Sequence, residues 1–460
     1  MRRLLPALRL SVSAWLLAAA GVSLASGPPD PADPLAQLQS AFSRAVTPGD
    51  EADRYRDLFT TILLRVQRSS AKDVDLPALA GVALRNLEPL PPGQGEPGEV
   101  FRKAMNEALR TLDPYARYID PRAYGNERGE SSGTFGGLGL ELEAGEGAVR
   151  VVAPVPGSPA ARAGLQAGDV IVRVDDKPLQ GLPLSDAISH MRGQPGTPVS
   201  LTVRRTAGTQ EFTVSITREV IRRRAVASSV DDQVLVLRVS SFSAPVTEAV
   251  EQAIAEASAG ELPLRGIVLD MRGNPGGLLR EAVKTADVFL HKGDIVSLRG
   301  RGTAVLRTWQ ADANELLAGL PMVVLLDGRS ASAAELVAAA LQENGRALVM
   351  GQRSYGKGTV QSTWPLGGER GALKLTTSLY IGPSGRSVQG VGVAPDVELV
   401  VPQPASREPS AEAAPEPRAR VEQARCGALR KGDAALSCAM AYLASGDLDS
   451  FVAATADLRP

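Results

Sequence analysis

The chain has 460 residues, of which 44% are hydrophobic, and its 50 Lys and Arg residues nearly balance its 51 Asp and Glu residues. This length predicts two or three domains. Charges of both signs are mixed along the chain without a basic block, which argues against a nucleic-acid-binding protein. Only two histidines occur, His190 and His291, and two isolated histidines do not form a zinc site of the common kinds. We therefore expect no metal cofactor.

The first 25 residues have the pattern of a signal peptide. Three arginines, Arg2, Arg3 and Arg9, precede an apolar stretch over residues 10–24, and small residues around Ala25 form a cleavage site. An uncleaved membrane anchor is the alternative, although the apolar run is short for a spanning helix. The pattern predicts an exported protein, which would be membrane-associated if this segment is retained.

Residues 26–131 are expected to form a helical region. Apolar residues recur at helical spacing within residues 35–90 and again over residues 100–112. A segment rich in Pro and Gly, residues 90–98, separates these two stretches. No motif here carries chemistry, so we interpret the region as a helical platform or a dimerisation arm.

Residues 132–219 resemble a PDZ domain. A glycine-rich start is followed by short strands, a helix over residues 182–191 and two closing strands. Such a turn can present successive backbone N–H groups to a terminal carboxylate, while the adjoining strand accepts an extended peptide by edge pairing. The alternative is that the glycines only make a tight entry into a strand. The residues that match the carboxylate-binding loop are Gly137, Leu138, Gly139 and Leu140.

Residues 220–400 have the pattern of an α/β core. Apolar runs of strand length at residues 234–239, 266–270, 322–326 and 347–350 alternate with helical stretches, which predicts crossover connections and a parallel sheet. A glycine pair follows the second of these strands. Its backbone N–H groups could stabilise an oxyanion, or the pair could be a structural turn.

A serine and a lysine follow neighbouring strands of this core. Ser332 lies at a strand-to-helix turn, and Lys357 lies in a glycine loop after the next strand. In a parallel sheet both would emerge at the carboxyl edge, where such folds place their sites. A buried lysine can accept the proton of a serine nucleophile, and the scarcity of histidine favours this pair over a Ser/His/Asp triad. Ser330 is the alternative nucleophile.

The lysine loop also imitates a phosphate-binding P-loop. Gly351, Gly356 and Lys357 have the spacing of that motif, but Gly358 stands where a P-loop needs Ser or Thr for magnesium. We therefore expect no nucleotide cofactor.

Four long motifs resemble those of carboxyl-terminal processing proteases, the tail-specific serine peptidases of family S41. They are LDPYARYIDPRAY at 112–124, DMRGNPGGLL at 270–279, SASAAELVAAALQENGRALVMGQRSYGKGTVQ at 330–361, and TTSLYIGPSGRSVQGVGVAPDVEL at 376–399. The resemblance covers roughly residues 100 to 400. One departure is Ala334, where members usually have serine.

The resemblance implies a crotonase-like α/β protease core within a mixed, multidomain α/β fold. It also assigns roles: Ser332 is the nucleophile, Lys357 the general base, and Gln361 the residue that orients the lysine. It places the oxyanion N–H donors on Ala333 and on either Gly276 or Gly277.

The function implied is that of an exported, periplasmic serine endopeptidase. Its PDZ domain would capture accessible, apolar C-terminal tails of substrate proteins, and an acyl-enzyme would form without any cofactor. An activating adaptor and a homo-oligomer are both compatible with this reading. The alternatives are a catalytically latent or dead protease scaffold that binds through its PDZ domain, and an oligomeric scaffold whose helical ends tether partners.

The chain ends in a linker and a small helical segment. Residues 401–417 are rich in Pro, Ala, Ser and Glu, and residues 418–460 predict two or three short helices. The only two cysteines, Cys426 and Cys438, lie in this segment without the neighbours of a catalytic thiol. In an oxidising compartment we expect them to form one disulfide.

Overall fold

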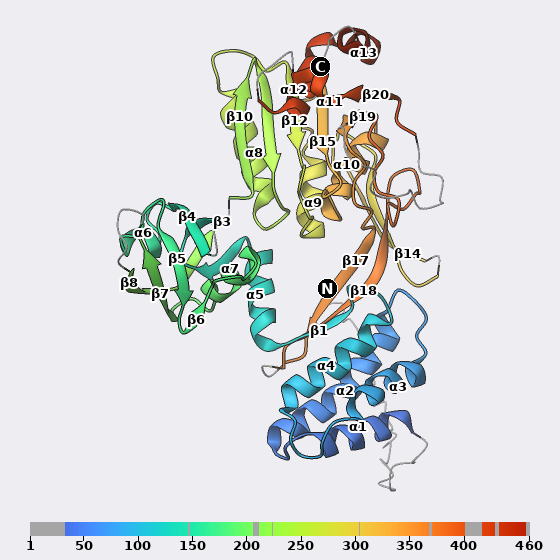
Figure 1. The fold of residues 1–460 in the computed structure, drawn as a ribbon. Helices are drawn as coiled ribbons and strands as arrows, with labels where there is room; N and C mark the ends of the chain where they lie inside the picture. The colour runs from blue at the N-terminus through green and yellow to red at the C-terminus, as the bar shows by residue number, and fades with distance from the viewer. Residues whose placement is uncertain are drawn as a thin grey trace, which may run out of the picture.

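The computed structural model describes residues 33–145, 148–205, 211–222, 224–302, 304–367, 370–400, 416–427 and 432–456. A helical bundle, a small β-module and an α/β core follow one another along the chain (Figure 1). The predicted signal peptide at residues 1–25 and most of the predicted linker at 401–417 lie outside the described residues. Among the helices that are described, none combines the length and apolar character of a membrane span.

Four helices form the N-terminal bundle: α1 (Pro34–Ala45), α2 (Asp50–Ser69), α3 (Leu76–Leu87) and α4 (Pro97–Arg110). An acidic side chain, Asp33, Asp75 or Glu96, accepts first-turn N–H groups at three of the four starts, each with a proline in the first turn. The bundle core also contains Leu373 and Leu375 from a distant strand. The bundle is therefore packed onto the rest of the protein.

Strand β1 (Arg117–Ile119) and helix α5 (Pro121–Ser131) lead from the bundle to the PDZ-like module. The chain enters and leaves the module through an antiparallel ribbon of β2 (Thr134–Gly137) and β9 (Glu219–Arg222). The module sheet has the order β3-β4-β5-β7-β8, so that β3 is an edge strand. Its elements are β3 (Leu140–Gly145), β4 (Ala148–Pro154), α6 (Pro159–Arg162), β5 (Val170–Val174), β6 (Lys177–Pro178), α7 (Leu184–Met191), β7 (Pro198–Arg204) and β8 (Glu211–Thr217).

The core is built on a seven-stranded sheet of order β10-β11-β12-β15-β16-β19-β20. All its pairings are parallel except that of β10 with β11. The predicted strands are confirmed as nearly continuous buried runs, because both faces of the sheet are covered. The strands are β10 (Val226–Asp231), β11 (Val234–Val239), β12 (Gly266–Asp270), β15 (Met322–Leu326), β16 (Leu348–Gly351), β19 (Val397–Val400) and β20 (Ala419–Glu422).

Helices α8 (Val246–Ser258), α9 (Leu279–Asp287) and α10 (Ala333–Glu343) pack on one face of this sheet. The C-terminal helices α11 (Gln423–Gly427), α12 (Ala434–Ser445) and α13 (Leu448–Ala456) pack on the other face. The mixed α/β multidomain class predicted from the sequence is thus confirmed.

A second sheet joins the core to the bundle, as the long hairpin of β17 and β18 shows in Figure 1. Strand β18 pairs with β1, β13 and β17. It therefore connects the N-terminal region to β17, the strand that follows the loop of Lys357. The strands not yet introduced are β13 (Asp294–Arg299), β14 (Val305–Gln310), β17 (Thr359–Pro365) and β18 (Ala372–Ile381).

The expectation that residues 418–460 are purely helical is wrong at their start. Residues 419–422 form β20, which pairs in parallel with β19 and points Val421 into the core. A four-residue strand whose exposure alternates carries no helical signal, and its pairing partner lies about twenty residues upstream. The C-terminal segment therefore completes the core sheet and covers one of its faces.

Candidate active site

Ser332 lies at the carboxyl edge of the core sheet, between β15 and the first turn of α10. Its φ of 56° is in the left-handed region, which is uncommon for a residue with a side chain and is often found at functional sites. The small residues Ala331, Ala333 and Ala334 around it are buried, so that backbone can approach closely. Ser332 itself is 8% exposed, so the residue is largely enclosed by the fold.

Ser330, the alternative nucleophile, is fully buried and its hydroxyl is used within the fold. The hydroxyl donates to the Met271 carbonyl over 2.9 Å and accepts a hydrogen bond from the Asp327 N–H over 3.0 Å. Ser330 therefore ties the nucleophile turn to the loop after β12, and Ser332 is the serine available for chemistry.

Lys357 lies in the loop between β16 and β17. Its ammonium group stands 4.3 Å from the centre of the Tyr115 ring. Burial lowers the pKa of Lys357, and the positive charges of Lys374 and Arg117 lower it further. The neutral amine that a general base requires is thus easier to form here than on an ordinary surface lysine.

Glu335 joins the nucleophile turn to the lysine loop. One carboxylate oxygen accepts the N–H of Ser332 (2.7 Å) and of Lys357 (2.8 Å). The other oxygen accepts the Ser354 hydroxyl (2.5 Å) and the Gly356 N–H (2.6 Å). Burial raises the pKa of this carboxyl group, and the four hydrogen bonds oppose that effect. Glu335 thus fixes the backbones of both proposed catalytic residues.

The sequence analysis missed Glu335, although a signal for it was present. A glutamate three residues after a serine at a helix start is the capping-box pattern, in which the glutamate accepts the serine N–H. That pattern would have predicted the bond to Ser332, but not the three bonds to residues 354–357.

Tyr380 is a second residue that the sequence analysis missed. Its buried phenol interacts with the Ser332 side chain, and its backbone N–H donates to the Gly358 carbonyl over 2.7 Å. Burial raises the pKa of the phenol to about 12, while the interaction with Ser332 acts in the opposite direction. Tyr380 therefore contacts the nucleophile and the lysine loop at once.

The predicted catalytic side chains share this edge of the sheet but are not hydrogen-bonded to one another. The amide of Gln361 donates to the Thr359 hydroxyl (2.9 Å) and to the Thr376 hydroxyl (3.4 Å). Among the described residues, neither Gln361 nor Ser332 forms a hydrogen bond with the Lys357 ammonium group. The structure thus brings together the backbones of a Ser/Lys pair while both side chains engage tyrosines.

The glycine pair after β12 packs directly against the nucleophile. A side chain on Gly276 would place its Cβ 2.8 Å from the Cβ of Ser332 and 3.0 Å from the N atom of Ala333, which leaves no room for one. The Gly276 N–H already donates to the Asn274 side chain over 2.8 Å.

The two glycines differ in what their N–H groups can do. The Gly276 carbonyl accepts the Phe242 N–H over 2.9 Å, so it points toward Phe242. In a trans peptide the carbonyl and the following N–H point in opposite directions, so the Gly277 N–H points away from Phe242. Of the two glycines, Gly277 is therefore our candidate for the oxyanion donor predicted in this loop.

The predicted carboxylate-binding loop lines a groove in the PDZ-like module. The cavity measures about 480 Å³ and lies between the edge strand β3 and helix α7. Its walls are largely apolar, with Ile188 and Met191 from α7 and Ile221 from β9. Gly139 has a φ of 72°, and a Cβ there would lie 2.3 Å from the Cβ of Ser158. The loop residues that line the groove are Gly137, Leu138, Gly139 and Leu140.

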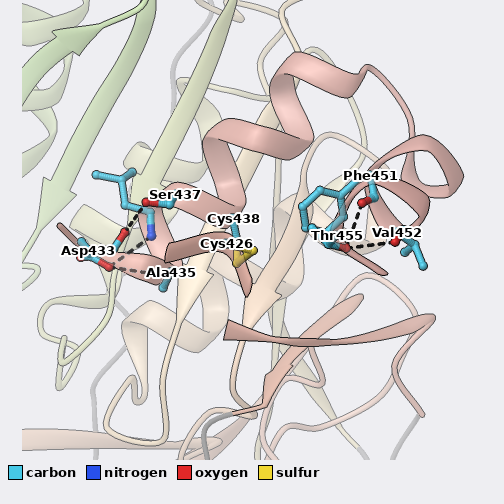
Figure 2. The surroundings of a disulfide bond; sticks show 9 residues. Cys426, Asp433, Ala435, Ser437, Cys438, Phe451, Val452 and Thr455 are labelled. Atoms are coloured by element: carbon cyan, nitrogen blue, oxygen red, sulfur yellow. Dashed lines mark hydrogen bonds between the residues drawn. A yellow bond between two sulfur atoms is a disulfide. The ribbon is translucent and has the colours of Figure 1, made fainter. Parts of the chain in front are cut away.

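Cys426 and Cys438 form a disulfide that joins α11 to α12 (Figure 2). The bond lies in the apolar cluster between the C-terminal helices and the core sheet.

Comparison with known proteins identifies the PDZ module and the protease core. The model of peptidase family S41 matches residues 233–399, and a PDZ domain model matches residues 150–205. The carboxy-terminal-processing protease of Bartonella bacilliformis is 41% identical over 309 residues, which cover 66% of this chain and 71% of that protein. A probable CtpA-like serine protease of Staphylococcus aureus is 35% identical over 308 residues, and the matched part spans 61% of its length.

Among solved structures, the photosystem II D1 C-terminal processing protease matches with a TM-score of 0.48 and 27% identity, over 76% of this chain and 94% of that one. The extent and identity of the match to the Bartonella protein show the family. The chain belongs to the carboxy-terminal-processing proteases of peptidase family S41, a family of serine peptidases.

Proposed function

We propose that this protein is an exported serine endopeptidase that recognises the C-terminal tails of substrate proteins and cleaves them with a Ser332/Lys357 dyad. The observation that carries the proposal is the Glu335 carboxylate, which binds the backbone N–H groups of both residues. Burying a carboxylate costs free energy unless hydrogen bonds compensate, and Glu335 accepts four of them. It holds Ser332 and Lys357, whose pKa is lowered, at one edge of the sheet.

Recognition begins in the PDZ groove. The tail carboxylate binds the backbone N–H groups of residues 137–140, and the last residues pair with the free edge of β3. The apolar walls of the groove support a preference for an apolar terminal side chain. Proteins with accessible apolar tails are therefore the proposed substrates.

In the chemical step the Ser332 hydroxyl attacks the peptide carbonyl carbon, and its proton passes to the neutral amine of Lys357. The N–H groups of Gly277 and Ala333 stabilise the oxyanion. The tetrahedral intermediate collapses, and the amine leaving group takes the proton from Lys357. Water then attacks the ester at Ser332, with Lys357 as base, and releases the enzyme. Gln361 holds the amine of Lys357 once that side chain has turned toward Ser332.

A latent resting state is a second feature of the proposal. Its support is that Ser332 interacts with Tyr380 and that the Lys357 ammonium group lies over the Tyr115 ring, with no Ser332–Lys357 hydrogen bond among the described residues. Substrate tails, an adaptor or self-association would then supply the energy for both side chains to turn.

Export to the periplasm is proposed from two observations. The first 25 residues have the signal-peptide pattern. The single disulfide between Cys426 and Cys438 requires an oxidising compartment to persist.

The test is hydrolysis of an unfolded protein by residues 26–460 in the presence of a chelator. We expect cleavage by the unmodified chain and none by Ser332→Ala or Lys357→Ala, with Ser330→Ala as the matched serine control. Binding of an apolar C-terminal peptide to the PDZ module should persist in all variants. Cleavage retained in Lys357→Ala would contradict the lysine base, and cleavage retained in Ser332→Ala would contradict the nucleophile.

A further inference from the structure

The C-terminal segment, described over residues 419–427 and 432–456, lies beyond the part of the chain that matches the protease family model. It is nevertheless built into the core. Val421, Met440 and Phe451 share one buried cluster with Val268 and Val323 of the central strands. This segment therefore packs on the face of the core sheet opposite helices α8, α9 and α10.

One ion pair links this segment to the loop that leads to the oxyanion glycines. The guanidinium of Arg272 donates to the two carboxylate oxygens of Asp433 over 2.9 and 2.5 Å. The same guanidinium donates to both oxygens of Asp270 over 2.9 and 2.7 Å. The Arg272 side chain is only 17% exposed, so the two carboxylates hold it in one orientation.

Arg272 is the first residue of a short, tightly fixed path to the nucleophile. The next residue, Gly273, donates its N–H to the Asp327 side chain over 2.9 Å. Four residues after Arg272, Gly276 touches Ser332 with no space for a methyl group. Arg272 is thus four residues from a glycine that packs against the nucleophile.

Asp433 is itself held firmly. Its carboxylate accepts the N–H groups of Ala435 and Leu436 at the start of α12, and its carbonyl accepts the Ser437 hydroxyl. Figure 2 shows these bonds beside the disulfide that ties the same helix to α11. The hydrogen bonds and charge of Arg272 hold the pKa of Asp433 below its usual range.

We propose that Asp433 is a positioning residue for the oxyanion loop, residues 272–277, and that the C-terminal segment is a working part of the catalytic centre. This inference rests on the proposed peptidase function. Asp433 touches no reacting atom. It acts through Arg272 by restricting where the backbone of Gly276 and Gly277 can lie.

The decisive variant is Asp433→Asn. Asparagine caps a helix as well as aspartate does, so the variant keeps the start of α12 and removes only the charge that binds Arg272. Loss of one oxyanion donor typically lowers kcat by about 100-fold or more, and we expect partial misplacement to lower it by about tenfold. KM and the affinity of the PDZ module for an apolar C-terminal peptide should not change. Asp433→Glu should recover part of the lost kcat.

Asp447→Asn is the matched control. Asp447 also binds the start of a C-terminal helix, through the Ser450 N–H at 2.8 Å, but it has no arginine partner among the described residues. A kcat for Asp433→Asn within twofold of the unmodified chain would overturn the proposal. So would an equal loss in Asp447→Asn, because the effect would then be general to the segment.

Hydrogen exchange separates this inference from the proposed function. If the unmodified chain cleaves nothing even with an apolar C-terminal peptide bound to its PDZ module, the peptidase proposal fails on its own. Faster exchange of the amides of residues 272–277 in Asp433→Asn, but not in Asp447→Asn, would still support the positioning role. Unchanged exchange in this loop would overturn it.

Discussion

The PDZ groove and the proposed catalytic centre differ in how close each is to the arrangement that its function needs. The groove is an open cavity of about 480 Å³, lined by the backbone of residues 137–140. In the catalytic centre Ser332 is 8% exposed, and both it and Lys357 are engaged with tyrosines. In the function we propose, recognition would depend on backbone groups that the turn fixes, whereas catalysis would depend on two side chains that must change partners.

Because of this difference, binding and catalysis carry different free-energy costs. Backbone N–H groups in a rigid turn lose little conformational entropy when a tail binds. In the proposed mechanism Ser332 and Lys357 leave their tyrosine contacts before they meet, so the active arrangement would be the less populated state. The backbone positions of the pair need not move, because Glu335 already fixes them.

The largest effect is expected from Glu335→Gln. Each carboxylate oxygen of Glu335 accepts two hydrogen bonds. The side chain of glutamine has only one oxygen, so its NH2 group would face two of the four donors. We expect kcat/KM to fall by about 100-fold or more, since Ser332 and Lys357 would lose their common anchor. Steady-state hydrolysis and a thermal melt would measure the change.

The control for Glu335→Gln lies on the same helix. Glu343, near the end of α10, accepts two hydrogen bonds from Ser384, and Glu343→Gln should leave the activity nearly unchanged. If Glu335→Gln kept activity within tenfold of the unmodified chain, the backbone anchor would not be what holds the pair.

The second effect concerns the groove alone. Gly139→Ala forces a side chain into the left-handed region and against Ser158, so we expect a C-terminal peptide to bind about tenfold more weakly. Gly157→Ala is the control, because Gly157 has a similar φ of 73° with open space around it. Peptide titration measures both. Equal losses in the two variants would show that backbone strain, and not the shape of the groove, governs binding.

Sequence alone was sufficient for the parts of this comparison that depend on local pattern. The strands at 234–239, 266–270 and 322–326 read as unbroken apolar runs because helices cover both faces of the sheet. Ser332 and Lys357 were predicted as a pair because small residues and glycines surround them, and their catalytic roles stay a prediction.

The remaining features depend on pairs of residues that are far apart in the chain. Nothing local places Tyr380 beside Ser332, since strand register in the second sheet sets that contact. Strand β20 and the Arg272–Asp433 ion pair likewise need a partner 20 or more residues away. A single sequence shows periodicity and spacing, and it does not show which distant backbones pair.

A smaller effect is expected in the pH dependence of hydrolysis. The positive charge of Lys374 lowers the pKa of Lys357, so that the neutral base forms at lower pH than in an ordinary lysine. Hydrolysis should rise with pH as Lys357 loses its proton. Lys374→Met removes the repulsion, raises the pKa of Lys357 and moves this rise toward higher pH, with roughly threefold lower activity at neutral pH.

The control for this change is Lys177→Met, which removes an exposed lysine of the PDZ module. Its pH profile of kcat/KM should coincide with that of the unmodified chain. A profile that moved toward lower pH in Lys374→Met would contradict the assignment of Lys357 as the base.

The smallest effect, and the only gain, is expected from Tyr380→Phe. Loss of the phenol hydroxyl removes the interaction that we propose competes with Lys357 for Ser332, and one hydrogen bond corresponds to about a threefold change in population. Reaction of Ser332 with a fluorophosphonate should therefore speed up about threefold without a PDZ ligand, and the difference should vanish at saturating C-terminal peptide. Tyr442→Phe, which removes a phenol of the C-terminal helices, is the control. Slower labelling of Tyr380→Phe would mean that the phenol orients the nucleophile for attack, and the contrast between a ready groove and a restrained catalytic pair would then have to rest on Tyr115 alone.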